Sequence, residues 1–137
     1  MCGHVSNKCL RYLQQEECFF ECEPNTIHWI VPTNKTYQNV PICALYCDAW
    51  FKACKHDRIC IVNWLTDVIR GVDGINWCPP DKPCKTYAEI YVNGAGICNR
   101  MWDKAYRYET SSNCMMMDFD PDGPTPNDQV DPNIIVG

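Results

Sequence analysis

The sequence NVPICALYCDAWFKACKHDRIC, residues 39–60, holds four cysteines in a short stretch. They are Cys43, Cys47, Cys54 and Cys60. Cysteines this close together can ligate zinc, bridge each other, or bridge distant segments of the chain. Zinc sites usually show two close pairs, or a close pair followed by spaced histidines, and the gaps here are irregular. The spacing therefore favours disulfides over a metal site.

A helix is predicted within this stretch, from Pro41, which suits a first helical turn, to about Lys55. Cys43, Cys47 and Cys54 then share one side of that helix. Side chains four apart on a helix rarely bridge each other, because their Cβ atoms are too far apart and poorly aimed. We expect each cysteine to bond to a different segment, so that this helix ties the rest of the chain together.

The composition of the whole chain fits an extracellular protein. It has 137 residues, 12 cysteines and a formal net charge of −5. This cysteine density is typical of secreted disulfide scaffolds, in which each bridge adds about 2–4 kcal/mol. No basic stripe suggests a nucleic-acid partner, and no apolar run is long enough to span a membrane. No signal peptide precedes Cys2, so a secreted form would be a processed chain, and the sequon at Asn34 predicts glycosylation.

The hydrophobic pattern predicts an α+β, predominantly helical fold with short strands and long loops. Further helices are expected at residues 5–22, 61–69 and 95–108, and short strands at 29–31 and 115–117. Residues 1–117 are expected to form one disulfide-rich domain. Residues 118–137 are acidic and rich in proline, so we expect a tail that contributes little to the core.

Six motifs in a fixed order carry a family resemblance. They are HVSNKC (4–9), CFFECEPN (18–25), NVPICALYCDAWFKAC (39–54), CIVNW (60–64), ICNRMWDKAYRY (97–108) and FDPDGPTPN (119–127). With these motifs the chain resembles the folate receptor and riboflavin-binding protein family over nearly its whole length. The resemblance implies a folate-receptor-type fold that binds a small molecule outside the cell.

The family's disulfides can be carried over to the matching cysteines. The resemblance implies the bridges Cys2–Cys84, Cys9–Cys54, Cys43–Cys114, Cys47–Cys98 and Cys60–Cys78. Cys18 and Cys22 are then left over, because in the family their partners lie in an N-terminal segment that this chain lacks. Either that segment was lost or trimmed, or the two cysteines bond to each other, which requires the helix to end or distort near Phe19.

The resemblance also implies a ligand site. In the folate receptor a pterin ring lies between two aromatic side chains, and the matching positions here are Phe20 and Trp102. An aspartate that binds the nitrogen edge of the ring is matched by Glu16, which supplies the same carboxylate one methylene further out. Tyr37, Trp64 and Tyr106 complete the set of expected ligand-binding residues. Without the resemblance, aromatic residues at such helical positions would be interpreted as core.

The residues that hold the acidic tail of folate in the family are largely replaced. Thr36 and Tyr37 stand where a basic residue and its neighbour are expected, and Leu65 and Thr66 replace a second basic pair. Of the tryptophans in that region only Trp64 is kept. We therefore expect a planar ligand without an acidic tail, such as a flavin, a pterin-like compound or a pigment, and not folate itself.

Other sites find little support in the sequence. The segment 118–123 begins like a calcium loop, but its twelfth position is Gln129 where a bidentate Glu is required. The histidines form no motif with a nucleophile, so neither an enzyme nor a metal site is expected, and no cofactor is predicted. The Met115–Met117 run could bind a soft metal, but a buried or edge strand is the commoner reason for such a run.

Two functions remain open from the sequence. The first is a secreted carrier, store or receptor ectodomain for a planar heterocycle. The second is an extracellular protein-recognition module that has lost its small ligand, because one branch of the family mediates sperm–egg contact after losing folate binding. The sequence does not choose between them, nor does it give the oligomeric state.

Overall fold

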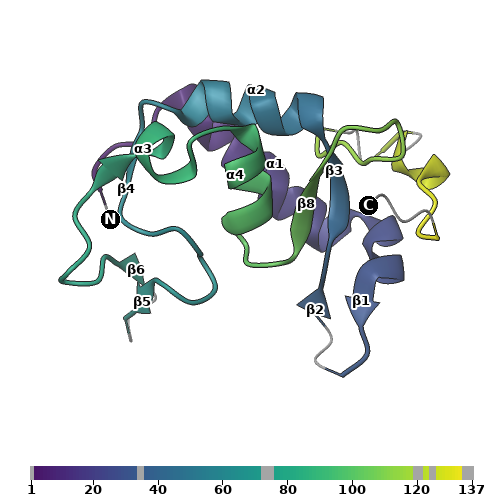
Figure 1. Cartoon of the computed structure of the whole chain (residues 1–137), viewed down its shortest axis with the longest axis horizontal. Coiled ribbons are helices and arrows are strands. Elements are labelled where there is room, and N and C mark those ends of the chain that lie inside the picture. Colours follow the sequence, from purple (N-terminus) through teal and green to yellow (C-terminus); the bar gives the residue numbers. More distant parts are fainter. Residues whose placement is uncertain (1, 34–35, 72–75, 119–121, 124–125, 134–137) are drawn as a thin grey trace.

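Helices dominate the computed structural model, which describes residues 2–33, 36–71, 76–118, 122–123 and 126–133 (Figure 1). The α-helices are α1 (Asn7–Cys22), α2 (Ala44–Cys54), α3 (Tyr87–Tyr91) and α4 (Gly94–Arg100), and the 3₁₀ helices are η1 (Pro24–Trp29) and η2 (Pro126–Gln129). The described strands form two-stranded pairs only: β1 (Ile30–Val31) with β2 (Thr36–Tyr37), β3 (Val40–Cys43) with β8 (Tyr106–Glu109), β4 (Arg58–Ile59) with β7 (Lys85–Thr86), and β5 (Ile69–Arg70) with β6 (Asn76–Trp77). The predicted α+β, predominantly helical class is confirmed.

Helix α1 has well-defined ends. Ser6 is its N-cap, and its hydroxyl accepts from the Cys9 amide at 3.3 Å and donates to Asp57 at 2.7 Å. An N-cap of this kind satisfies one of the free amides of the first turn. At the other end the Glu23 amide donates to the Phe19 carbonyl, and Pro24 begins η1. The predicted helix is confirmed, and it begins two residues later than expected.

Helix α2 lies across the top of the molecule in Figure 1 and packs on α1 and α4. It buries Tyr46, Cys47, Trp50 and Cys54 in the core. Pro41, however, does not lie in its first turn. Pro41 is fully buried in strand β3, which pairs in parallel with β8. The prediction of a helix start at Pro41 is therefore wrong, because the burial of Val40, Pro41 and Ile42 and their pairing with β8 favour the extended form.

Two further predicted helices are corrected. Residues 61–69 form turns that lead into β5, because the Asp67 carboxylate accepts from the Val62 and Asn63 amides, and the Asn63 side chain accepts from the Leu65 amide. Such side-chain bonds to the backbone compete with a helix. The helix predicted at 95–108 ends at Arg100 in α4, and the chain turns at Asp103, where φ is 56°.

The short strand expected at residues 115–117 is reduced to one bridge, between Met115 and Ile42. Beyond it, Asn127 in η2 is buried and exchanges hydrogen bonds with the Met116 backbone. Its amide also donates to the Glu23 carboxylate at 2.9 Å, so η2 is held against the end of α1. Asn34 and residues 119–121 of the calcium-like segment lie outside the described residues.

Five disulfides connect these elements. They are Cys2–Cys84, Cys9–Cys54, Cys43–Cys114, Cys47–Cys98 and Cys60–Cys78, as the family resemblance implied. Cys18 and Cys22 are exposed thiols one turn apart on α1, which runs through Phe19 without interruption. Across the described residues, no helix combines the length and the apolar character needed to cross a membrane.

Candidate functional site

A cavity of about 610 Å³ opens between α1, β2, the turns after Cys60, and the turn after α4. It is lined by Leu13, Glu16, Glu17, Phe20, Thr36, Tyr37, Trp64, Leu65, Asn76, Trp102 and Ala105. Small-molecule sites in proteins usually have volumes of about 300–1,000 Å³ and mostly apolar walls with a few polar groups. This cavity has that size and that composition.

Aromatic rings form its walls in two pairs. The indoles of Trp64 and Trp102 are stacked, with ring centroids 6.1 Å apart and planes 18° apart. Phe20 and Tyr37 meet edge to face, with centroids 5.2 Å apart. Phe20 and Trp102, expected to face a ligand from both sides, thus each contact another ring, and all four rings line the same cavity. Such walls suit a flat aromatic ligand, which stacks on them or meets them edge to face.

The loop that carries Trp64 is fixed to the turn after α4. The Trp64 amide donates to the Met101 carbonyl at 2.8 Å, and the Asn63 side chain donates to the Asp103 carboxylate at 3.0 Å. These two bonds bring Trp64 next to Trp102. Asn76, in β6 of the hairpin that ends this loop, supplies a polar side chain to the same cavity.

Glu16 is the buried acid of the cavity, with 4% of its surface exposed. Burial raises its pKa to about 7, and the charge of Glu17 adds to the rise. The Tyr106 hydroxyl donates to Oε1 of Glu16 at 2.7 Å and opposes that rise. The raised pKa brings the protonated form within reach near neutral pH. The carboxylate form can accept from a ligand N–H, and the protonated form can donate to a ligand carbonyl.

Tyr106 itself is not among the residues that line the cavity. It is buried, and its ring meets Phe19 edge to face. Burial and the neighbouring Glu16 raise the pKa of its hydroxyl well above the ordinary value, so it stays a donor at physiological pH. Tyr106 therefore positions Glu16 from outside the cavity lining, and its expected role in ligand binding stays a prediction.

The amino-acid sequence is similar to those of known proteins. Residues 1–117 match the model of the Folate receptor family. The chain belongs to the folate receptor family. Among its relatives, "Riboflavin-binding protein" of Gallus gallus is 40% identical over 118 residues, which are 85% of this chain and 49% of the relative. "Folate receptor gamma" of Homo sapiens is 30% identical over 138 residues, which cover 94% of this chain and 56% of that protein. The chain spans about half the length of these folate receptor family members.

In this folate receptor family chain, the sequence predicted five of the eleven residues that line the cavity. Glu16, Phe20, Tyr37, Trp64 and Trp102 were expected at a ligand site, and all five line the cavity. Leu13, Glu17, Thr36, Leu65 and Ala105 line it too, although none was named as a ligand-binding residue. Asn76 was missed altogether. It follows a turn-rich segment with no periodicity, and only the folded hairpin brings it to the cavity.

The charges in the cavity have one sign. Two of its lining residues, Glu16 and Glu17, are acidic, and none of the described lining residues is Lys, Arg or His. Thr36 and Leu65, which stand where the family resemblance places basic groups, both reach the cavity wall. Among the described lining residues, a bound anion would therefore meet two carboxylates and uncharged side chains, and no cation.

A cluster of three sulfurs elsewhere does not form a metal centre. The Sγ atoms of Cys2, Cys78 and Cys84 lie within 4.8 Å of one another, and they form the only such group among the described His, Cys, Asp and Glu residues. All three are disulfide-bonded, to one another or to Cys60. Thiolates, and not disulfide sulfurs, are the strong metal ligands, so this member of the family has no metal donor set at that place.

Proposed function

We propose that this chain is an extracellular binding domain for a small planar heterocycle without an acidic tail. The observation that carries the proposal is a buried carboxyl, Glu16, set in an aromatic-walled cavity where none of the described lining residues is basic. A ring system that carries both N–H and carbonyl groups along one edge matches a carboxyl that can accept and donate. The stacked and edge-on aromatic walls match its flat faces.

Riboflavin is the ligand we propose first. A relative 40% identical to this chain is named for riboflavin binding, and the flavin ring is flat and uncharged with polar groups along one edge. Its side chain is a neutral polyol, which needs no cation. The same reasoning covers other uncharged planar pigments, so a protein purified from its source is expected to absorb light above the 280 nm protein band.

Folate is expected to bind more weakly. Its acidic tail would enter or border a cavity that already holds Glu16 and Glu17 and offers no described basic partner. A carboxylate that loses water without gaining a charged donor forfeits about 1.5–3 kcal/mol per missing hydrogen bond. The proposal thus places the ligand preference of this chain nearer to the riboflavin-binding relatives than to the folate receptors.

Titration tests this proposal directly. Riboflavin added to the purified protein is expected to lose its fluorescence as it stacks on the indoles, while folate under the same conditions leaves tryptophan emission nearly unchanged.

Binding of a ligand that donates an N–H to Glu16 is expected to weaken as the pH falls below about 7, because protonation removes the acceptor charge. Equal affinity for both vitamins would refute the ligand preference.

Recognition of another protein is the second candidate. Leu65, Ile69 and Trp77 expose 54%, 46% and 56% of their surfaces, and Ile69 and Trp77 face each other across the β5–β6 pair. Exposed apolar groups of this size occur at protein contacts. Native mass spectrometry separates the candidates, because a carrier purified from its source is expected to retain a small molecule and a recognition module is not.

A further inference from the structure

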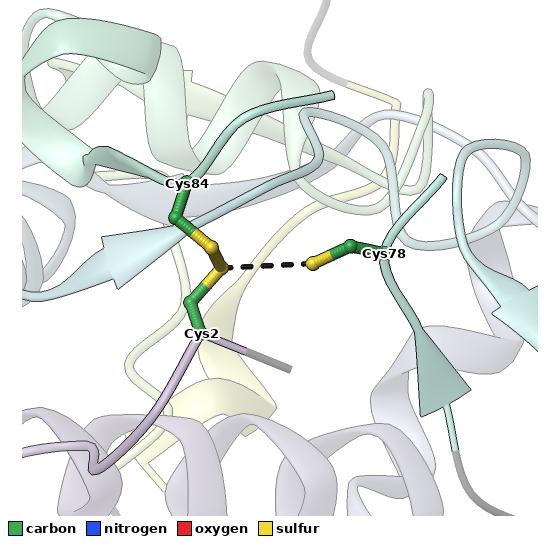
Figure 2. Close-up of side chains that lie close together, drawn as sticks. All are labelled: Cys2, Cys78 and Cys84. Carbon is green, nitrogen blue, oxygen red and sulfur yellow. Dashed lines mark hydrogen bonds between the residues drawn. A yellow bond between two sulfur atoms is a disulfide. The ribbon is translucent and has the colours of Figure 1, made fainter. Parts of the chain in front are cut away.

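Two of the five disulfides lie in direct contact. Sγ of Cys2, bonded to Cys84, is 3.6 Å from Sγ of Cys78, which is bonded to Cys60 (Figure 2). Neither of these sulfurs carries a proton, so the contact drawn as a dashed line is a van der Waals contact and not a hydrogen bond. At this distance a thiolate formed at Cys2 would already touch the sulfur of the neighbouring disulfide.

The other two half-cystines of these bridges are also placed to meet. Strands β4 and β7 run antiparallel, with Arg58 opposite Thr86 and Ile59 opposite Lys85. The described pair ends at Ile59 and Lys85, and its register, if continued by one residue, would set Cys60 opposite Cys84. Directly opposed residues of antiparallel strands have Cα atoms about 4.5–5.5 Å apart, which is within the range that a disulfide spans.

We propose that Cys2, Cys60, Cys78 and Cys84 form an exchangeable quartet with two connectivities. The first connectivity is Cys2–Cys84 with Cys60–Cys78, as in this structure. The second is Cys2–Cys78 with Cys60–Cys84. A thiol, either a small molecule of the glutathione type or a thiol–disulfide oxidoreductase, catalyses the interconversion.

The exchange proceeds in three balanced steps. An incoming thiolate attacks Sγ of Cys84, forms a mixed disulfide there and expels the Cys2 thiolate. Cys2 then attacks Sγ of Cys78, forms Cys2–Cys78 and expels the Cys60 thiolate. Cys60 attacks the mixed disulfide at Cys84, forms Cys60–Cys84 and releases the incoming thiolate unchanged. The number of disulfides is the same before and after, so no net oxidant or reductant is consumed.

The entry point of this reaction is accessible and basic. Cys2, Cys78 and Cys84 are partly exposed, whereas Cys60 is buried. The guanidinium of Arg58 donates to the Cys84 carbonyl at 2.8 Å, and Lys85 is the next residue in the chain. Neighbouring cations favour thiolates, both the one that approaches Cys84 and the one that leaves it.

The exchange changes how one wall of the cavity is tied down. The Cys60–Cys78 bond closes the segment that carries Trp64, Leu65 and Asn76, three residues of the cavity lining. In the second connectivity the end of this segment is bonded to Cys2 instead of to its own beginning. If the chain binds a ligand as proposed above, the second connectivity weakens that binding; the exchange itself does not depend on the ligand.

Disulfide mapping of the unmodified chain tests the proposal. Cys18 and Cys22 are first blocked with N-ethylmaleimide, so that added reduced glutathione is the only nucleophile. After incubation without denaturant and an acid quench, we expect proteolytic peptides joined through Cys2–Cys78 and through Cys60–Cys84, with the other three bridges intact. Recovery of the original bridges alone, or of Cys2 and Cys84 as free thiols beside an intact Cys60–Cys78, would overturn it.

A variant pair isolates the central step. Cys84→Ser leaves Cys2 as a free thiol beside Cys78, so we expect Cys2–Cys78 to form and Cys60 to be alkylated in most molecules. The matched control, Cys2→Ser with Cys84→Ser, has no thiol in the quartet and is expected to keep Cys60–Cys78 and an unalkylated Cys60. An unalkylated Cys60 in folded Cys84→Ser protein would contradict the proposal.

Tryptophan emission of the exchanged wild-type chain, measured without ligand, is expected to shift because the segment that carries Trp64 is no longer closed by the Cys60–Cys78 bond. Failure of riboflavin to bind would leave this measurement and the disulfide mapping unaffected.

Discussion

At the scale of single residues, Glu16 combines two properties that a structural residue would not need together. It is almost fully buried, and its pKa is raised to about 7 chiefly by that burial. A carboxyl kept in this state costs stability, which proteins accept mainly at functional sites. The Tyr106 hydroxyl holds Oε1 of Glu16 by a hydrogen bond, and Glu16 is one of the residues that line the cavity.

The raised pKa of Glu16 predicts a pH dependence of folding. The folded chain binds this proton more tightly than the unfolded chain, whose Glu has a pKa near 4.5. The resulting stabilisation is complete below pH 4.5 and is lost as the pH rises through about 7, with a total change on the order of 3 kcal/mol. Glu16→Gln is expected to remove this slope from the free energy of unfolding, measured by guanidinium titration with the disulfides intact at several pH values.

Glu17→Gln is the matched control for that measurement. Glu17 lies next in the chain, is exposed, and contributes less to the raised pKa of Glu16 than burial does. The control is therefore expected to keep most of the slope. An identical pH profile for the wild type and Glu16→Gln would show that Glu16 titrates normally.

Trp102 carries the second residue-scale prediction. Trp102→Ala removes a stacking face worth about 0.5–1.5 kcal/mol beyond the area that it buries, so riboflavin affinity is expected to fall by about tenfold or more. Fluorescence titration measures the change. Trp77→Ala removes an indole that does not line the cavity, and it is expected to leave the affinity unchanged. Equal losses in both variants would place the ligand elsewhere.

At the scale of elements, the loop between Cys60 and β5 is held by Asp67. Its carboxylate accepts from the Val62 and Asn63 amides at 3.2 and 2.9 Å, and the Asn63 amide is the main reason its pKa lies below the ordinary value. These bonds replace the helix that the periodicity of residues 61–69 predicts. They also fix the backbone at Asn63, the residue that precedes Trp64.

Asp67→Ala is expected to loosen this loop. Hydrogen bonds to a charged acceptor contribute about 1.5–3 kcal/mol each, so the loss is expected to appear as faster hydrogen exchange of the Val62 and Asn63 amides. Thr66→Ala removes only the exposed hydroxyl bonded to Asp67, and is expected to change this exchange little. Unchanged protection in Asp67→Ala would contradict this role of Asp67 and would mean that the bonds from Trp64 to Met101 and from Asn63 to Asp103 hold the loop without it.

The same loop shows where sequence reasoning about elements stops. Helix α1 was predictable because its residues carry an apolar face and Pro24 follows its end, whereas its start at Ser6 was not predicted. Pro41 was misplaced because its fate depends on β8, whose residues are distant in sequence. The cavity wall at Asn76 depends on a hairpin that carries no periodic signal. Local sequence patterns thus predicted local elements such as α1. They did not predict the conformation of residues that are fixed by pairing with segments distant in the sequence.

At the scale of the whole molecule, disulfides connect segments that secondary structure alone would leave apart. The described strands form only two-stranded pairs, which are marginal by themselves. Two of the five bridges join helices, α1 to α2 and α2 to α4, and the other three tie β3 and residues next to β4, β6 and β7 to distant parts of the chain. The pairings could be anticipated from the family resemblance, because cysteine order survives where side chains at the site differ. The ligand could not be anticipated in this way, since it depends on the few residues that line one cavity.

Binding of riboflavin and folate to the same protein sample tests the central claim most directly. Equilibrium dialysis at neutral pH gives both affinities without relying on fluorescence. A cavity with aromatic walls, a buried Glu16 carboxyl and no described cation predicts that riboflavin binds at least about tenfold more tightly than folate, since one unpaired charged hydrogen bond already costs that much. Folate binding as tightly as riboflavin, or the binding of neither, would contradict the account.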